Sequence, residues 1–123
     1  MNKRLCLLVL PLLLAGCTTI SNLTPSQYPR TADSRYRLEA SWRTSQQSIR
    51  PESIKPTVVI GFNSYEMHPI PLVEDRWEAF VPVPADTDVI YFRYKFDFMK
   101  NSFGGKPRPD SLMSSEYKLR ITP

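Results

Sequence analysis

The sequence predicts an all-β protein, folded as an antiparallel β-sandwich of roughly five to seven short strands. Apolar and polar side chains alternate with a period of two over several segments between residues 35 and 123, as in strands with one buried face. Turn-forming residues recur at intervals of about ten. The chain also contains 12 prolines, which disfavour long helices.

The first predicted strand covers residues 35–43. Four apolar side chains occupy alternate positions, and charged or small polar ones lie between them: Tyr36, Leu38, Ala40 and Trp42. A strand of this pattern has one apolar and one charged face, so we expect it to be half-buried, with Trp42 in the core.

Two further strands are predicted in the middle of the chain. Residues 57–62 include the β-branched run Val58, Val59 and Ile60, which favours a buried strand ending at a turn near residues 63–64. Residues 65–72 continue as an extended segment. Because Pro69 and Pro71 lack the amide hydrogen needed for a ladder bond, we place this segment at a sheet edge.

The strongest alternation lies in the next two segments. Residues 77–83 place Trp77 and three smaller apolar side chains on one face and Phe80 on the other. In residues 89–99 the inward set is wholly apolar: Ile90, Phe92, Tyr94, Phe96 and Phe98. A slip of one residue would bury charged groups, so the register of this strand is well specified.

The C-terminal part is predicted as a long loop followed by a final strand. Residues 101–115 are rich in Gly, Pro and Ser, which favours irregular structure. Residues 116–121 alternate again, with Tyr117, Leu119 and Ile121 inward and Lys118 and Arg120 outward.

The N-terminus carries a compact export pattern. Two cations at positions 3 and 4 precede the apolar residues 5–14, and Leu14-Ala15-Gly16-Cys17 follows directly. The apolar stretch is about half of the ~20 residues that a transmembrane helix requires. An ordinary secretory signal would not need a cysteine at this position.

This segment resembles the signal sequences of bacterial lipoproteins. The resemblance implies that Leu14, Ala15 and Gly16 are read by the signal peptidase, that cleavage precedes Cys17, and that Cys17 receives a diacylglycerol and an amide-linked acyl chain such as palmitate. Two or three acyl chains anchor a protein stably. In enteric lipoproteins the residue after the lipidated cysteine directs sorting, and Thr18 in place of Asp implies the outer membrane of a Gram-negative host.

These features divide the chain into a signal peptide (1–16), a lipidated and flexible tether (17–34) and a β-sandwich domain (35–123). The tether is predicted because residues 18–34 are polar and contain Pro25 and Pro29 without sustained periodicity. Loss of the signal leaves about 107 residues, enough for one small domain. Cys6 leaves with the signal, so no disulfide is expected.

Charge argues against nucleic acid as a partner. The formal net charge of the whole chain is +4, and two of its cations belong to the signal. The remaining charge, about +2, is too small to indicate nucleic-acid binding.

The order Trp77-Glu78, Val81-Pro82-Val83-Pro84 and Tyr94-Lys95-Phe96-Asp97 is similar to the pattern of early-set immunoglobulin-like domains, which include glycogen- and starch-binding modules. The resemblance covers about residues 58–98. It implies an immunoglobulin-like β-sandwich, and it raises glycan binding as a possible function.

Catalytic and metal sites find little support in the sequence. His68 is the sole imidazole, and Cys17 is assigned to lipid. Zinc needs three or four His or Cys ligands, which the chain does not supply. The acidic pairs Glu74/Asp75 and Asp86/Asp88 are of the calcium-ligating type, but acidic residues are common in turns. We therefore expect a protein that is not an enzyme and holds no metal or other cofactor.

The candidate interaction face consists of polar-face aromatics, neighbouring cations and one loop residue: Phe80, Tyr91, Arg93, Lys95 and Phe103. Exposed aromatic rings beside cations suit either a protein partner or a sugar ring. The first hypothesis is a non-enzymatic, lipid-anchored module that docks an envelope protein or stabilises an assembly. The alternative is a glycan-binding module, which requires two or three coplanar exposed rings.

Overall fold

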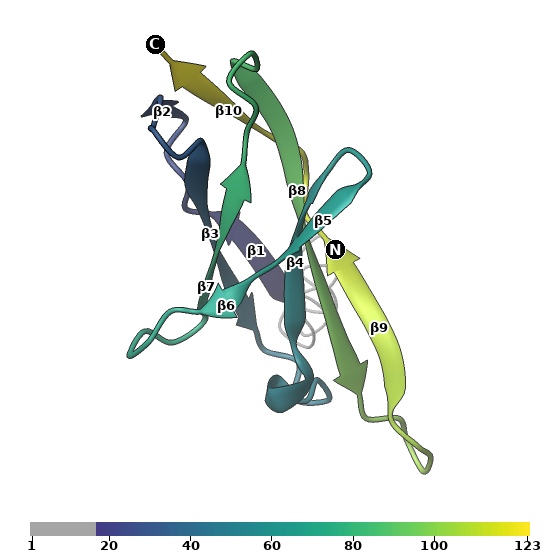
Figure 1. Ribbon diagram of the computed structural model, residues 1–123. Helices are drawn as coiled ribbons and strands as arrows, with labels where there is room; N and C mark the ends of the chain where they lie inside the picture. The colour runs from purple at the N-terminus through teal and green to yellow at the C-terminus, as the bar shows by residue number, and fades with distance from the viewer. Residues whose placement is uncertain (1–16) are drawn as a thin grey trace, which may run out of the picture.

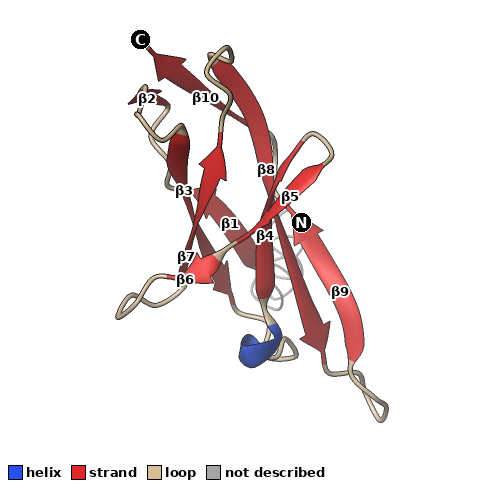
Figure 2. Ribbon diagram, in the orientation of Figure 1, coloured by secondary structure: helices blue, strands red, loops and turns tan. Residues whose placement is uncertain are grey.

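The computed structural model describes residues 17–123. Two β-sheets pack face to face, and the remaining regular element is one short 3-10 turn, η1 (Pro51–Ser53) (Figures 1 and 2). The predicted fold class, an all-β sandwich of mainly antiparallel sheets, is confirmed. The predicted signal segment, with Leu14, Ala15 and Gly16, lies outside the described residues.

The first sheet has the strand order β1-β3-β7-β6. Its members are β1 (Thr18–Asn22), β3 (Arg35–Thr44), β7 (Arg76–Pro82) and β6 (His68–Pro69). All its pairings are antiparallel.

The second sheet has the order β2-β10-β8-β4-β5, and β9 also pairs with β8. Its members are β2 (Gln27–Pro29), β10 (Tyr117–Thr122), β8 (Val89–Lys100), β4 (Lys55–Ile60), β5 (Asn63–Glu66) and β9 (Arg108–Met113). The pairing of β2 with β10 is parallel and the others are antiparallel.

The core forms where the alternating apolar faces of β3, β7 and β8 meet. Their buried side chains are Tyr36, Leu38, Ala40, Trp42, Ala79, Val81, Ile90, Phe92, Tyr94, Phe96 and Phe98. The Trp42 ring stacks on Phe96, with centroids 4.7 Å apart. Trp77 is only half-buried and packs against the edge of this core. The prediction of a core position is therefore confirmed for Trp42 and holds only in part for Trp77.

The chain changes sheets between β5 and β6. A two-residue turn, Gly61-Phe62, joins β4 to β5, because Ile60 pairs with Asn63. The turn comes two residues earlier than expected, since Gly61 adopts φ +59°, a conformation that glycine tolerates best. Beyond β5 the chain crosses to the first sheet, where β6 is the edge strand that Pro69 predicted.

The predicted flexible tether is wrong. Within residues 17–34, β1 pairs with β3 over five positions, and β2 pairs with β10 over three. Ile20 and Tyr28 pack against the core. Both strands are too short to show a period, and their partners lie far along the chain, so pairing rather than local composition orders this segment.

The predicted long loop over residues 101–115 is also wrong in its second half. Residues 108–113 form β9, which pairs with the last six residues of β8. All six side chains of β9 are exposed, so no apolar face marked the strand in the sequence. The hairpin of β8 and β9 extends from one end of the sandwich (Figure 1).

Candidate functional site

Cys17, the expected lipid-attachment residue, stands at the start of the folded domain. It is exposed, its thiol is free, and Thr18 begins β1 directly after it. The Cys17 amide donates to Ser45 Oγ at 3.1 Å, and the Ser45 amide donates to the Cys17 carbonyl at 2.9 Å. The backbone of Cys17 is therefore held against the end of β3 while its side chain faces solvent.

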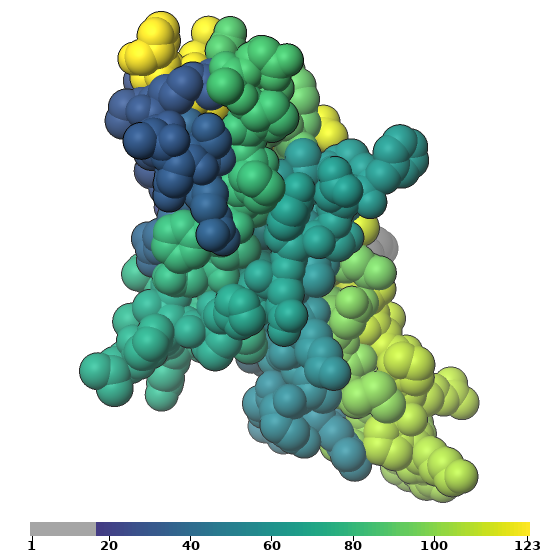
Figure 3. Space-filling view, viewed as in Figure 1, coloured from purple at the N-terminus to yellow at the C-terminus, as the bar shows by residue number. Residues whose placement is uncertain are grey.

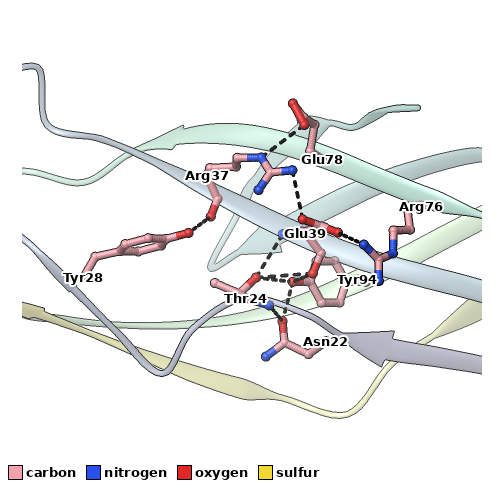
Figure 4. Close-up of polar contacts among 8 residues, drawn as sticks. All are labelled: Asn22, Thr24, Tyr28, Arg37, Glu39, Arg76, Glu78 and Tyr94. Atoms are coloured by element: carbon pink, nitrogen blue, oxygen red, sulfur yellow. Dashed lines mark hydrogen bonds and ion pairs between the residues drawn. The ribbon is translucent and has the colours of Figure 1, made fainter. Parts of the chain in front are cut away.

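A polar cluster fixes the segment that follows β1 (Figure 4). The Tyr94 hydroxyl donates to Asn22 Oδ1 at 2.6 Å and lies 2.9 Å from both Thr24 Oγ1 and the Glu39 carbonyl oxygen. The Leu23 amide donates to the same carbonyl at 2.9 Å. Burial raises the pKa of Tyr94 far above its ordinary value, although the hydrogen bond with Thr24 opposes the shift. Tyr94 is therefore a neutral donor that joins the two sheets.

The carboxylate of Glu39 lies in a small ion cluster beside this network (Figure 4). Arg37 Nη2 lies 2.9 Å from Glu39 Oε1, Arg76 Nη1 lies 3.6 Å from Glu39 Oε2, and Arg37 Nε binds Glu78 Oε2 at 3.1 Å. Partial burial disfavours the charge of Arg37, but the hydrogen bond and charge of Glu78, together with the charge of Glu39, raise its pKa. Two cations thus compensate the nearly buried Glu39, and the cluster has a structural role.

The structure separates the predicted interaction residues into three places. Phe80 lies on β7 in the first sheet, opposite Arg37. Tyr91, Arg93 and Lys95 lie on β8 in the second sheet, where they share its outer face. Phe103 lies in the turn between β8 and β9 and is fully exposed. The prediction of a single face containing all five residues is therefore wrong, because β7 and β8 belong to different sheets.

The predicted residues that do share one face are those on β8 around Tyr91, which is 53% exposed. Tyr91 pairs across strands with Lys118, and Val89 pairs with Arg120. Arg93 lies 3.9 Å from Glu116, and Lys95 lies 3.7 Å from Asp97. Both ion pairs are exposed, so each contributes little to stability and both cations remain accessible to solvent.

Sequence analysis missed Lys118 and Arg120 as members of this face. Their alternation with Leu119 and Ile121 placed them outward, but only the register of β10 on β8 places them beside Tyr91 and Val89. We name the set Tyr91, Arg93, Lys118 and Arg120 the outer basic face. It joins one aromatic ring to three cations.

The described residues contain no platform of coplanar exposed rings. Tyr91 and Phe80 are on different sheets, Trp42 is 2% exposed, and Trp77 packs against the core. Stacking on a sugar ring needs neighbouring ring faces on one surface, so the glycan-binding alternative lacks its main expected feature in this part of the chain.

Other candidate residues lie apart from one another. His68 is exposed on β6, and Asp88 is paired with Arg30 at 3.0 Å. Over residues 17–123, no three His, Cys, Asp or Glu side chains are arranged to hold a metal ion. An open groove of about 760 Å³ runs beside η1, β8 and β9, with Arg50, Lys55, Asp97 and Asp110 on its walls. These charges are mixed in sign.

No helix among residues 17–123 has both the length and the apolar character needed to cross a membrane.

Comparisons with known proteins leave the family open. No protein-family model and no curated protein matches the sequence. Among solved structures, a chain of murine CRIg is similar with a TM-score of 0.48 and 11% identity, over 88% of this chain and 100% of that one. A chain from a structure concerning T cell specificity and activation by the bacterial superantigen toxic shock syndrome toxin-1 has a TM-score of 0.41 and 10% identity, over 86% of this chain and 100% of its own.

Proposed function

We propose that this protein is a non-enzymatic, lipid-anchored module of the bacterial envelope that docks a partner protein at the outer membrane. One observation carries the proposal: the sequence Leu14-Ala15-Gly16-Cys17 ends in a cysteine that is exposed and directly precedes the folded domain. A thiol in this position is accessible to lipid transfer, and the sandwich that follows is compatible with an anchor at its N-terminus.

A binding role fits the chemistry of the outer basic face. The ring of Tyr91 offers apolar contact area with a polar tip, and Arg93, Lys118 and Arg120 surround it with positive charge. Aromatic and Arg side chains contribute much of the affinity of protein interfaces. The proposed partner is accordingly an envelope protein with an acidic surface.

The anchor is tested by metabolic labelling with radioactive palmitate in a Gram-negative host, followed by membrane fractionation. The unchanged chain should incorporate label and sediment with the outer membrane. Cys17→Ala should incorporate none and should remain as an unprocessed precursor or be released. A Cys17→Ala chain that is still cleaved and membrane-bound would refute the anchor.

The partner is tested by affinity purification of the full-length protein from gently solubilised envelopes, with analysis of bound proteins and glycans. We expect a stoichiometric protein partner that is lost with Tyr91→Ala and Lys118→Glu and retained with Phe80→Ala. Phe80 is a matched control because it is 50% exposed on the opposite sheet. Enrichment of a polysaccharide without a protein would refute docking and favour the glycan-binding alternative.

A further inference from the structure

The position of Cys17 restricts how an anchored domain would meet the membrane. Thr18 already pairs with Thr44, and their hydroxyl oxygens lie 2.8 Å apart. No tether therefore separates the proposed lipid from the sandwich. A lipid on Cys17 would hold this end of the domain close to the bilayer, rather than at the end of an extended linker.

A continuous set of contacts joins Cys17 to the turn between β8 and β9. Ser45 binds the backbone of Cys17, and three residues further on the Ser48 carbonyl accepts the Asn101 amide at 2.7 Å. Ile49 forms a bridge with Lys100, and Arg50 Nε donates to Asn101 Oδ1 at 2.8 Å. The turn thus belongs to the end of the sandwich that carries Cys17.

The turn itself, residues 101–107, has the side chains of a membrane-contacting element. Phe103 is fully exposed at its tip and precedes Gly104 and Gly105. A hydrogen bond of 2.7 Å from Ser102 Oγ to the Lys106 carbonyl closes the turn. A closed turn holds this large apolar side chain in water. Its transfer into the interfacial region of a bilayer lowers the free energy of the system, because apolar surface leaves water.

Positive charge surrounds this tip. Residues 98–109 contain Lys100, Lys106 and Arg108 and no Asp or Glu. Lys100 lies 3.9 Å from Asp110 in an exposed pair, whereas Lys106 and Arg108 make no ion pair within the described part of the chain. Cations beside an apolar tip are attracted to the phosphates of an anionic leaflet.

We propose that the turn over residues 101–107 is a second membrane contact, which rests on the proposed lipid anchor at Cys17. Phe103 enters the interfacial region of an anionic phospholipid leaflet, and Lys106 and Arg108 lie at its phosphates. Two points of attachment, the lipid and the turn, fix the orientation of the sandwich and leave the outer basic face free along its side.

Two other exposed tips lack this combination. Phe62 is as exposed as Phe103, but its turn lies at the far end of β4 from η1 and has no cation from residue 61 to 66. Figure 3 shows the turn between β4 and β5, in teal, and the turn between β8 and β9, in yellow-green, as separate projections. Leu72 is also exposed, but Glu74 and Asp75 follow it, and acidic side chains oppose approach to an anionic leaflet.

The test uses the full-length lipoprotein, purified from its host and reconstituted in vesicles of phosphatidylethanolamine with phosphatidylglycerol as the anionic component. Phe103→Cys and the matched control Phe62→Cys are each labelled with an environment-sensitive maleimide dye. In these vesicles we expect the dye at residue 103 to emit at shorter wavelengths than the dye at residue 62 and to be less quenched by aqueous iodide.

The cations are tested in the same assay with Lys106→Ser and Arg108→Ser added to Phe103→Cys, which should reduce the shift. A vesicle-bound protein whose dye at residue 103 behaves like that at residue 62 would overturn the proposal. The chain without substitutions distinguishes failure of the lipid anchor at Cys17 from failure of the second contact at residues 101–107. If its Cys17 reacts with the maleimide and the protein does not float with vesicles, the lipid anchor is refuted.

Discussion

Tyr94→Phe is the most informative single change, because it removes one oxygen and leaves the ring in place. Tyr94 is fully buried on β8, and its hydroxyl contacts three groups: the side chain of Asn22 at the end of β1, the side chain of Thr24 just after it, and the backbone of Glu39 on β3. The ring keeps its contacts with Phe92 and Tyr117 in the variant. The substitution therefore tests whether this hydroxyl orders the N-terminal segment.

The expected cost follows from the number of partners. A net contribution of about 1 kcal/mol is typical of one intramolecular hydrogen bond, and a buried acceptor left without a donor costs about 1–3 kcal/mol. Asn22 Oδ1 keeps a bond from the Thr24 amide at 3.2 Å, and the Glu39 carbonyl keeps one from the Leu23 amide. Because both acceptors retain a partner, we expect Tyr94→Phe to lower the free energy of unfolding by about 2 kcal/mol.

The assay is urea unfolding of residues 17–123 carrying Cys17→Ser, followed by fluorescence, with Tyr91→Phe as the control. Tyr91 lies on the same strand but faces solvent, so its change should cost less than about 0.5 kcal/mol. Hydrogen exchange should quicken at the Leu23 amide in the Tyr94 variant. Equal free energies of unfolding for the two variants, or unchanged exchange at Leu23, would refute the role assigned to the hydroxyl.

Three further predictions concern the fold. Trp42→Ala should lower the free energy of unfolding by about 3–5 kcal/mol, because the ring stacks on Phe96 in the core. Trp77 is half-buried, so Trp77→Ala should lower it by only about 2 kcal/mol. Urea titrations that give the same loss for both variants would contradict this ranking. Gly61→Ala should cost about 1 kcal/mol in the same titrations from its φ of +59° alone, since an added Cβ would meet nothing within 4 Å. The hydrogen bond from the Arg35 amide lowers the pKa of Asp33 below its ordinary value of 3.8, so the ionised Asp33 stabilises the folded state above pH 3.8 and this stabilisation is lost as the pH falls through the lower folded pKa. Asp33→Asn should therefore make the free energy of unfolding depend less steeply on pH in acid. An unchanged pH profile would exclude this contribution of Asp33 to stability.

The long strands were predictable from the sequence because their signal is local. Side chains along a strand alternate in direction, so an apolar face appears as a period of two, wherever the partner strand lies. This holds for β3 and β8, whose alternate side chains are buried as expected. The edge position of β6 followed equally from Pro69, because a missing amide hydrogen is a property of the residue itself.

The errors have a common physical cause. β1 and β2 lie in a segment that was predicted to be a tether, and β9 lies in a predicted loop. β1 and β2 are held by backbone bonds to strands far along the chain and β9 by bonds to the preceding strand β8, and none of the three has a full apolar face of its own. Phe80 and Tyr91 illustrate the same point for the candidate site. Both were correctly expected to face outward, but the sheet to which each strand belongs was not encoded locally.

The sequence by itself determined the fold class, the inward faces of the long strands and the motif that ends at Cys17, because each depends on the order of neighbouring residues. The tertiary structure decided which side chains share a surface. It placed Lys118 beside Tyr91, separated Phe80 from both, and joined the end that carries Cys17 to the turn of Phe103. These relations depend on strand register and on contacts between distant segments, which no local pattern of side chains specifies.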